Sequence, residues 1–586
     1  MFTTLTAKFP AGIDWPATLA LGSVAGVYLW LAFGVLPPGG YWMPDTGMKR
    51  IQAANVRFNP APDLTIDYPG QWLDPDFKFL PFAHNFYFIW QGRVHFSQPF
   101  YVAFMGRPFI RLMGDYGERV VPLLAGLVSV YLTGRLAQIL GVRPVWPSVL
   151  LAGFATPLIF YSLSFWEHTL AAALGLGALA LVLRPAGAPP WPLRVYLVSG
   201  LLAGLGGVVR KEIMFFALAL GVVLALNAVR EAAPYRRRAS SGLAAWSSAC
   251  VCVFVVYLLA SYLNSGHPVP PEFRIAAPPS FTPRAYLLVH GWTGLADFLF
   301  DPRFGRAGTW LMITVGVYWL AGLWPRPAAL RTAMQVGALA VLCLGVGSFM
   351  WGQSASPYLR GVFSASPWLV LGLRPQAGER RLARDLSLTA LGFLGLAILS
   401  LGLLTTAGAG HGGGEWGARF FLTVFPLGAP LAASSLQTIW ERAAQGWLAR
   451  LRLALALALV GLSLAIQGLG LIGLRAGFAS SLELRWAILA LPETQVVTNQ
   501  VWLASRVPKV YLSKEVFRLD AREDWVAWVQ AADARGVRRF AFVSSGLPDE
   551  AVLAAAAPPG TQIKVIETRR LDEGFFATRL EITPSP

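Results

Sequence analysis

Long apolar runs, separated by short polar segments, make up most of the chain as far as about residue 475. Thirteen of these runs match or approach the about 20 residues that a helix needs to cross a bilayer. The run at 15–36 is too long for a signal-peptide core and no small-residue cleavage site follows it, so it counts as the first helix. The pattern predicts membrane-spanning helices at 15–36, 119–140, 147–164, 169–183, 195–209, 213–229, 242–263, 309–324, 330–349, 361–373, 386–406, 420–440 and 453–474.

Composition supports the same class of protein. Hydrophobic residues make up 55% of the chain, charged residues only 13%, and the mean hydropathy is +0.53, which excludes an ordinary soluble globule. The net charge of +17 would suggest nucleic-acid binding in a soluble protein. Membrane proteins, however, concentrate arginine in cytoplasmic loops, so no nucleic-acid partner is expected. The three cysteines lie inside apolar runs, where packed side chains are expected rather than disulfides or metal ligands.

The distribution of arginine predicts the orientation. If the N-terminus is cytoplasmic, every second loop is arginine-rich, as the positive-inside rule requires. These loops carry Arg143, Arg184, Arg194, Arg236, Arg237, Arg238, Arg381, Arg384, Arg442 and Arg450. The long loop 37–118, the turns at 165–168 and 210–212, the segments 350–360 and 408–419, and the C-terminal tail then face the other side. We therefore expect a multi-pass inner-membrane protein whose chemistry and C-terminal domain are extracytoplasmic.

The tail changes character at about residue 478, where charged residues alternate with short β-type runs. We predict strands at 494–503, 539–544, 562–567 and 576–582 and an amphipathic helix at 522–535. The chain thus divides into a transmembrane domain, 1–477, with its large first outer loop, and a small α/β domain, 478–586. The tail contains neither a glycine-rich dinucleotide fingerprint nor a Walker motif, so structural support or acceptor docking is expected there.

Three groups of polar residues stand at the predicted outer border of the membrane. Asp45 follows the first helix, and a carboxylate at that depth is costly unless it has a partner or a function; a turn or helix cap is the alternative. Glu167 and His168 form either a substrate contact or an ion-paired interface. Arg210 and Lys211 lie in a short outer turn, against the positive-inside trend, and suit phosphate binding; simple snorkelling anchors are the alternative.

The order of these motifs resembles the GT-C glycosyltransferases, which include the protein O-mannosyltransferases and aminoarabinose transferases. The resemblance rests on Pro44-Asp45-Thr46-Gly47-Met48-Lys49-Arg50, on Ser164-Phe165-Trp166-Glu167-His168, on Arg210-Lys211-Glu212, and on Gly413-Gly414-Glu415-Trp416-Gly417-Ala418-Arg419-Phe420. It covers most of residues 11–440. The second acid is Glu167 where many relatives have Asp, and the first motif holds one acid instead of a pair. No cofactor is therefore implied with certainty, and a divalent cation is left open.

The resemblance implies a polytopic enzyme that transfers a hexosyl or pentosyl group from a polyprenyl-phosphate donor to an acceptor hydroxyl, with inversion, in cell-envelope glycan biosynthesis. It implies Asp45 as the general base. It also implies substrate contacts and cations for the departing phosphate. The expected substrate contacts are Glu167, His168, Lys49, Arg50 and Trp416, and the expected phosphate ligands are Arg210, Lys211, Arg360 and Arg419. The acceptor is a glycan, lipid or protein that the sequence does not identify.

Two other functions fit the same composition. A transporter or flippase of lipid-linked saccharide would be expected to place ionisable residues or broken helices near the middle of the membrane. Here the ionisable residues gather at the outer border instead. A ligase or polymerase acting on a diphosphate-linked oligosaccharide would use similar parts and differ mainly in its donor.

Overall fold

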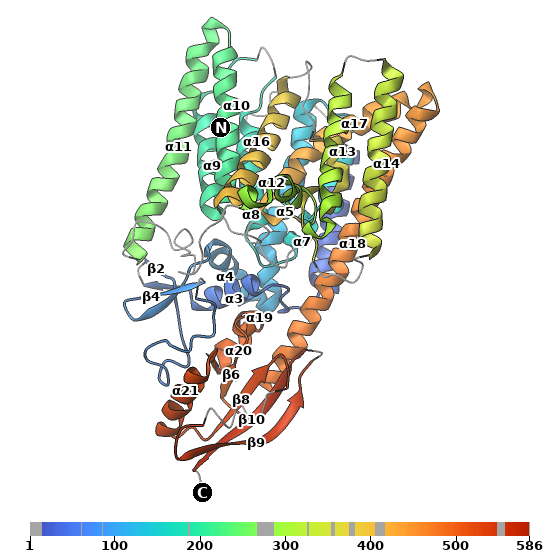
Figure 1. Cartoon of the computed structure of the whole chain (residues 1–586). Coiled ribbons are helices and arrows are strands. Elements are labelled where there is room, and N and C mark those ends of the chain that lie inside the picture. The colour runs from blue at the N-terminus through green and yellow to red at the C-terminus, as the bar shows by residue number, and fades with distance from the viewer. Residues whose placement is uncertain are drawn as a thin grey trace.

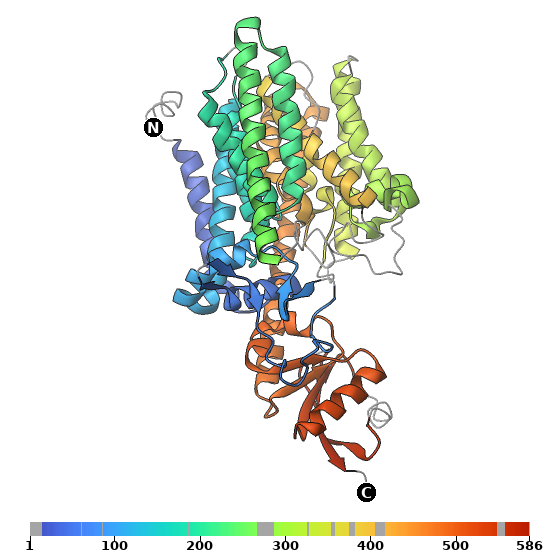
Figure 2. The same ribbon diagram turned by 90° about the vertical axis from the view of Figure 1, so that its left-hand side faces the viewer.

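The computed structural model describes residues 14–59, 61–84, 86–185, 188–265, 286–324, 327–352, 358–373, 381–404, 416–547, 557–572 and 574–584. Figures 1 and 2 show a bundle of long helices, a small C-terminal domain beyond one end of it, and the first outer segment between the two. The predicted fold class, a polytopic helical membrane protein with a small C-terminal α/β domain, is confirmed.

The bundle contains most of the helical residues. Its helices are α2 (Trp15–Trp30) with η1 (Leu31–Val35), α5 (Val120–Leu140), α6 (Trp146–Phe154), α7 (Leu158–Ser162), α8 (His168–Val182), α9 (Leu193–Val209), α10 (Glu212–Arg230), α11 (Ala233–Ser265), α13 (Arg306–Leu323), α14 (Ala328–Gly352), α16 (Arg381–Leu404), α17 (Val424–Arg442) and α18 (Trp447–Leu489). Among the described residues, seven helical stretches are long and apolar enough to cross a membrane. They are Trp15–Val35, Tyr101–Leu140, Glu212–Arg230, Ala233–Leu263, Ala328–Gly352, Arg381–Leu403 and Trp447–Leu489; α8 and α9 are shorter apolar helices.

The predicted span at 361–373 is wrong. This segment forms a four-residue helix, α15 (Val362–Ala365), and a 3-10 helix, η5 (Pro367–Leu371). Gly361 has a positive φ of 85°, and Pro367 lacks the N–H that would continue a helix, so the chain cannot form one straight span. Its apolar side chains are instead buried against α17 and α18. The prediction at 147–164 is likewise divided, into α6 and α7.

The first outer segment begins with α3 (Pro44–Asn55) and continues through strands and α4 (Tyr101–Met113) into the 3-10 helix η2 (Gly114–Arg119). The strands are β1 (Arg57–Asn59), β2 (Ala61–Asp63), β3 (Thr65–Ile66), β4 (Tyr87–Trp90) and β5 (Arg93–Phe96). β1 and β2 form a hairpin, and β3, β5 and β4 form an antiparallel sheet in that order. Three further short elements connect the later helices: α12 (Tyr286–Leu299), η4 (Pro302–Phe304) and η7 (Arg419–Phe421).

The C-terminal domain is a five-stranded sheet in the order β7-β6-β8-β10-β9. Its elements are β6 (Gln495–Thr498), α19 (Leu503–Arg506), α20 (Pro508–Ser513), β7 (Glu515–Arg518), α21 (Arg522–Ala534), β8 (Arg539–Ser544), β9 (Thr561–Arg570) and β10 (Phe576–Pro584). β6 runs parallel to β7 and β8, whereas β10 is antiparallel to β8 and β9. The predicted strands and helix are present, except that 499–503 leaves the sheet and β7 was not predicted.

The first outer segment and the C-terminal domain share one hydrophobic core. Phe82 packs against Tyr511 with ring centroids 4.9 Å apart, and the Tyr511 hydroxyl donates to the carbonyl of Asp67. The backbone N–H of Arg518 donates to the carbonyl of Phe79 at 2.9 Å. α18 crosses the predicted boundary at 477/478 without a break. The outer region is therefore built from two segments that are far apart in the sequence.

Helix α3 and the C-terminal domain touch most closely at Gly47. A Cβ atom on Gly47 would lie 1.7 Å from the carbonyl oxygen of Ser505 in α19. Gly47→Ala should therefore lower stability, because overpacking a close contact costs about 1–3 kcal/mol. The measurement is the thermal unfolding midpoint of the purified protein. Gly26→Ala, in helix α2 with no atom within 4 Å of the added methyl group, is the control; equal midpoints would contradict the close contact.

Candidate active site

Helix α3 presents two charged side chains on one face. Pro44 occupies the first helical position, where its missing N–H costs nothing, and Asp45 lies in the first turn, where the helix dipole favours a carboxylate. Lys49 follows one turn later on the same face. α3 lies between the bundle and the C-terminal domain (Figure 1), so both side chains stand at the border of the two regions.

Asp45 is held by two partners from distant parts of the chain. Gln98 donates its side-chain N–H to Oδ1 of Asp45 at 2.9 Å. Arg419, from η7, donates to Oδ2 at 3.2 Å. The side chain of Asp45 keeps 19% of its surface exposed, so the carboxylate is oriented by its partners and still accessible.

Arg419 is also held between aromatic rings. Its guanidinium carbon lies 4.8 Å from the ring centroid of Trp166 and 4.8 Å from that of Phe420. Such cation–π contacts contribute about 0.5–2 kcal/mol each, and they use the face of the guanidinium while its N–H groups at the edge of the plane meet the Asp45 carboxylate. Phe420 lies under a second cation as well, with Arg210 5.7 Å from its centroid.

Behind Asp45, a chain of buried charges connects α3 to the turn between α9 and α10. Glu167 lies 3.5 Å from the Lys49 ammonium through Oε2 and accepts a hydrogen bond from Arg210 at 3.0 Å through Oε1. Arg210 also forms an ion pair with Glu212. Lys49 donates to the carbonyl of Pro99. Lys49 and Glu167 are each only 1% exposed, so these charges depend on one another for compensation.

The pKa shifts in this chain follow from burial and pairing. Burial alone would raise the pKa of Glu167, but Lys49 and Arg210 reverse this and hold it below its ordinary value. Burial lowers the pKa of Lys49, and Glu167 offsets part of that shift. For Arg210, burial opposes the charged form, but Glu212 and Glu167 outweigh it and raise the pKa. Glu167 is thus an ionised carboxylate neutralised by two cations.

Near these charges, His168 is packed between aromatic rings, and Arg360 is held by its backbone. His168 is 4% exposed, and its ring lies 5.3 Å from that of Tyr161 and 5.0 Å from that of Trp166. No described residue is a hydrogen-bond partner of its Nε2 atom. Arg360 donates its backbone N–H to the buried carboxylate of Asp301 at 2.8 Å.

A β-bridge brings two predicted phosphate ligands into adjacent segments. Leu359 pairs with Trp416, and the N–H of Gly417 donates to the carbonyl of Leu359. These contacts place the chain around Arg360 beside the chain that leads to Arg419. Tyr358 also packs edge-on against Trp42, with ring centroids 5.9 Å apart. Trp42 lies three residues before Asp45. The predicted Gly413–Glu415 part of the motif lies outside the described residues.

Three of the residues expected in the site differ from Asp45 and Arg419 in their surroundings. Arg50 points to the other side of α3 and forms a 3.0 Å ion pair with Glu118. Lys211 is exposed at the start of α10. Trp416 is 2% exposed and packs directly against Gly470 of α18, so it supports the fold at this point. In the part of the chain that the structure describes, no cluster of three or more His, Cys, Asp or Glu side chains could hold a metal ion.

Some site residues gave no signal in the sequence. Gln98 lies in an irregular loop with no motif around it, and its contact with Asp45 spans 53 positions. In the sequence, Trp166 and Phe420 resemble the aromatic residues that are common at the membrane–water interface. Asp301 and Arg360 lie in two outer segments that share an Arg, Gly and aromatic pattern in the sequence, but that pattern does not indicate that the Asp301 carboxylate binds both Arg303 and the Arg360 backbone.

Comparisons with known proteins give structural similarity only. No protein-family model matches the chain, and no curated protein sequence matches it. Its structure is similar to that of ArnT from Cupriavidus metallidurans in the apo state, at 12% identity over 96% of this chain and 98% of that one, with a TM-score of 0.49. It is also similar to the archaeal oligosaccharyltransferase AglB from Archaeoglobus fulgidus, at 12% identity over 90% and 69%, with a TM-score of 0.46. A third similar structure is arabinofuranosyltransferase AftD from Mycobacteria, at 12% identity over 96% and 40%, with a TM-score of 0.37.

Proposed function

We propose that this protein is an inverting membrane glycosyltransferase that transfers a sugar from a polyprenyl-phosphate donor to an acceptor hydroxyl on the extracytoplasmic face. The observation that carries the proposal is the partly exposed Asp45 carboxylate paired with Arg419. A base and a cation side by side are the two groups that displacement of a sugar phosphate requires.

In the proposed reaction, the acceptor hydroxyl gives its proton to Asp45 as its oxygen attacks the anomeric carbon. The bond between that carbon and the phosphate oxygen breaks, and polyprenyl phosphate leaves with the electron pair. Arg419 pairs with the developing negative charge, because its guanidinium can exchange a carboxylate for a phosphate. Arg360 is a second ligand from the adjacent segment. Glu167 holds Lys49 and Arg210 in place behind the site.

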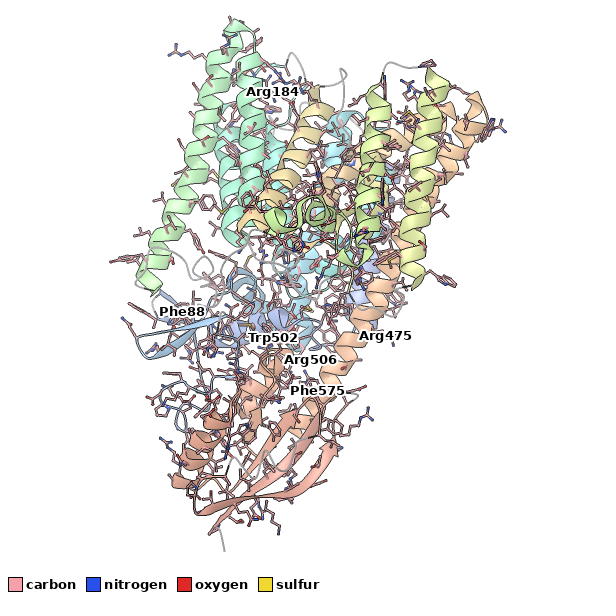
Figure 3. The ribbon with its side chains drawn as sticks, in the orientation of Figure 1. Phe88, Arg184, Arg475, Trp502, Arg506 and Phe575 are labelled. Atoms are coloured by element: carbon pink, nitrogen blue, oxygen red, sulfur yellow. The ribbon has the colours of Figure 1, made fainter. Side chains whose placement is uncertain are left out.

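The proposal includes the orientation of the protein in the membrane. Figure 3 shows Arg184 at the end of the bundle away from the C-terminal domain, with Trp502, Arg506 and Phe575 at the other end. Arg184 belongs to the loops expected in the cytoplasm. We therefore place Asp45, Arg419 and the C-terminal domain on the outer side of the inner membrane.

Arg419→Gln should weaken binding of polyprenyl phosphate about 10- to 100-fold, because a hydrogen bond to a charged group contributes about 1.5–3 kcal/mol. Arg237→Gln is the control, since Arg237 is exposed near the start of α11. Binding is measured by titrating labelled polyprenyl phosphate into the purified proteins. Equal affinities would remove Arg419 from the phosphate site.

The activity itself is tested with radiolabelled polyprenyl-phosphate sugars presented to the purified protein in vesicles. A glycosyltransferase converts the donor into free polyprenyl phosphate and a labelled product. A flippase would move the donor across the membrane without consuming it, and that result would overturn the proposal.

A further inference from the structure

A cavity of about 920 Å³ lies beside the candidate active site. One wall comes from the β3-β5-β4 sheet and the segment that follows it; the other comes from the outer ends of α9 and α11. Phe88, which lines the cavity, lies below the end of α11 in Figure 3. The volume is at the upper end of the range of about 300–1,000 Å³ that is typical of small-molecule sites.

The wall from α9 and α11 is mostly apolar and includes exposed side chains of both helices. Leu205 on α9 and Val256 on α11 line the cavity, and they are 45% and 60% exposed. α11 is among the helices long and apolar enough to span a membrane. An occupant that covers this wall therefore needs an apolar chain that can lie against a lipid-facing helix surface.

The opposite wall is polar and incompletely satisfied. Gln52, His95 and Gln98 all line the cavity. Oε1 of Gln52, Nε2 of His95 and Oε1 of Gln98 are buried atoms with no hydrogen-bond partner among the described residues. Burying a polar group without a partner costs free energy. Three such atoms on one wall therefore indicate that the occupant supplies hydrogen-bonding groups.

The polar wall leads directly to Asp45. Gln52 donates its side-chain N–H to the backbone carbonyl of Gln98 at 3.0 Å, and Gln98 donates to Oδ1 of Asp45. The other oxygen of Asp45 faces Arg419. Gln98 thus links the cavity to one oxygen of the Asp45 carboxylate, and Arg419 binds the other oxygen.

The charges around the cavity exclude a phosphate as the group bound there. Among its described lining residues, the one lysine or arginine is Arg93. Arg93 is 63% exposed and lies 3.5 Å from the carboxylate of Asp63. Burial lowers the pKa of His95, so its ring is neutral at neutral pH. The wall suits a neutral head group that carries hydroxyls.

We infer that this cavity binds the acceptor as an amphiphile, with an apolar chain against α9 and α11 and a hydroxyl-bearing head at Gln52, His95 and Gln98. The assignment of the bound amphiphile as the acceptor rests on the proposed function. The amphiphile site itself rests on the two walls. The geometry delivers the head-group hydroxyl to Asp45 from the side of Gln98, while the donor phosphate occupies the side of Arg419.

The test uses dodecyl glucoside carrying a diazirine in its alkyl chain, photo-crosslinked to the full-length protein in phosphatidylcholine nanodiscs. Label is expected on peptides of α9 and α11. Val256→Trp places a larger side chain in the cavity. It should reduce labelling of these peptides at least about tenfold, which corresponds to about 1.4 kcal/mol of binding free energy. Val255→Trp is the matched control, because Val255 is the next residue, is 56% exposed and does not line the cavity.

A second variant separates the head group from the chain. His95→Phe keeps the ring that stacks on Phe88 at 5.0 Å and removes the buried nitrogen, so it should also reduce labelling. Excess dodecyl glucoside should displace the probe, whereas methyl glucoside, which lacks the chain, should not.

The inference is overturned if Val256→Trp and Val255→Trp label equally, or if methyl glucoside competes as well as dodecyl glucoside. Polyprenyl phosphate binding, measured on the same preparations, should not change in Val256→Trp. If the natural protein is not labelled but still binds and consumes the donor, the amphiphile site is rejected and the proposed glycosyltransferase function stands. Specific labelling without any donor consumption would instead reject the glycosyltransferase and keep the amphiphile site.

Discussion

Replacing Asp45 by Asn is expected to lower turnover by about 10²–10⁴, the usual contribution of a general base, while donor affinity changes only a few fold. Asn keeps the volume and can still accept the hydrogen bond from Gln98, but it cannot take the acceptor proton. The measurement is single-turnover transfer from the labelled donor, together with donor titration and thermal unfolding of the same preparation.

Asp115→Asn is the matched control for this experiment. Asp115 is another ion-paired carboxylate in the first outer segment, and its ion-pair partners among the described residues are Arg485 at 3.4 Å and Lys509 at 2.7 Å, which are not part of the Asp45 network. A folded Asp45→Asn protein with near-normal turnover would show that Asp45 is only a helix-end residue, for which Asn serves equally well. Glu167 would be a poor replacement as base, because two cations neutralise it and it is 1% exposed.

Replacing Glu167 by Gln is expected to destabilise the protein by about 3–5 kcal/mol, the usual cost of leaving a buried charge without its partner. Lys49 would retain only the carbonyl of Pro99. Lys49→Met should cost less, because Glu167 would still pair with Arg210. Thermal unfolding midpoints of the two variants provide the test, and a smaller loss in Glu167→Gln than in Lys49→Met would contradict the network.

The stability of the Glu167→Gln variant should depend on pH through the ammonium group of Lys49. Burial already lowers the pKa of Lys49 from 10.5, and losing Glu167 removes the group that offsets this shift. Between the lowered folded value and 10.5, the unfolded chain binds more protons than the folded one, so stability rises with pH in that window. The rise should be larger in Glu167→Gln than in the natural protein.

Local pattern predicted the helices and the α/β tail because both depend on nearby residues. Apolar runs with few charges specify spans, and alternation specified β8 and β10. The failure at 361–373 has a local cause that composition hides: Gly361 and Pro367 interrupt a run that hydropathy alone reads as continuous. The predicted span ended at 474, where the apolar run ends. The helix α18 itself continues to Leu489, because no proline interrupts residues 475–489.

The site was only partly predictable, since its contacts join residues that periodicity does not relate. The sequence placed Asp45, Glu167, Arg210 and Arg419 on one side of the membrane, and the structure brings these four together. It could not indicate that Arg419 reaches Asp45 across 374 positions or that Arg50 turns away from it. Which side of α3 each cation occupies depends on tertiary packing.

The shared outer core also sets an order of events during synthesis. Residues 48–96 contribute the smaller part of that core, and the larger part comes from residues 484–582. At about 5–20 residues per second, the N-terminal part of the core is made tens of seconds before the C-terminal part, and most of the bundle helices are made in the interval. Throughout that time Ile51, Phe82 and Phe96 lack their final partners. The segment that carries Asp45 therefore reaches its final packing only after the C-terminal domain has been made.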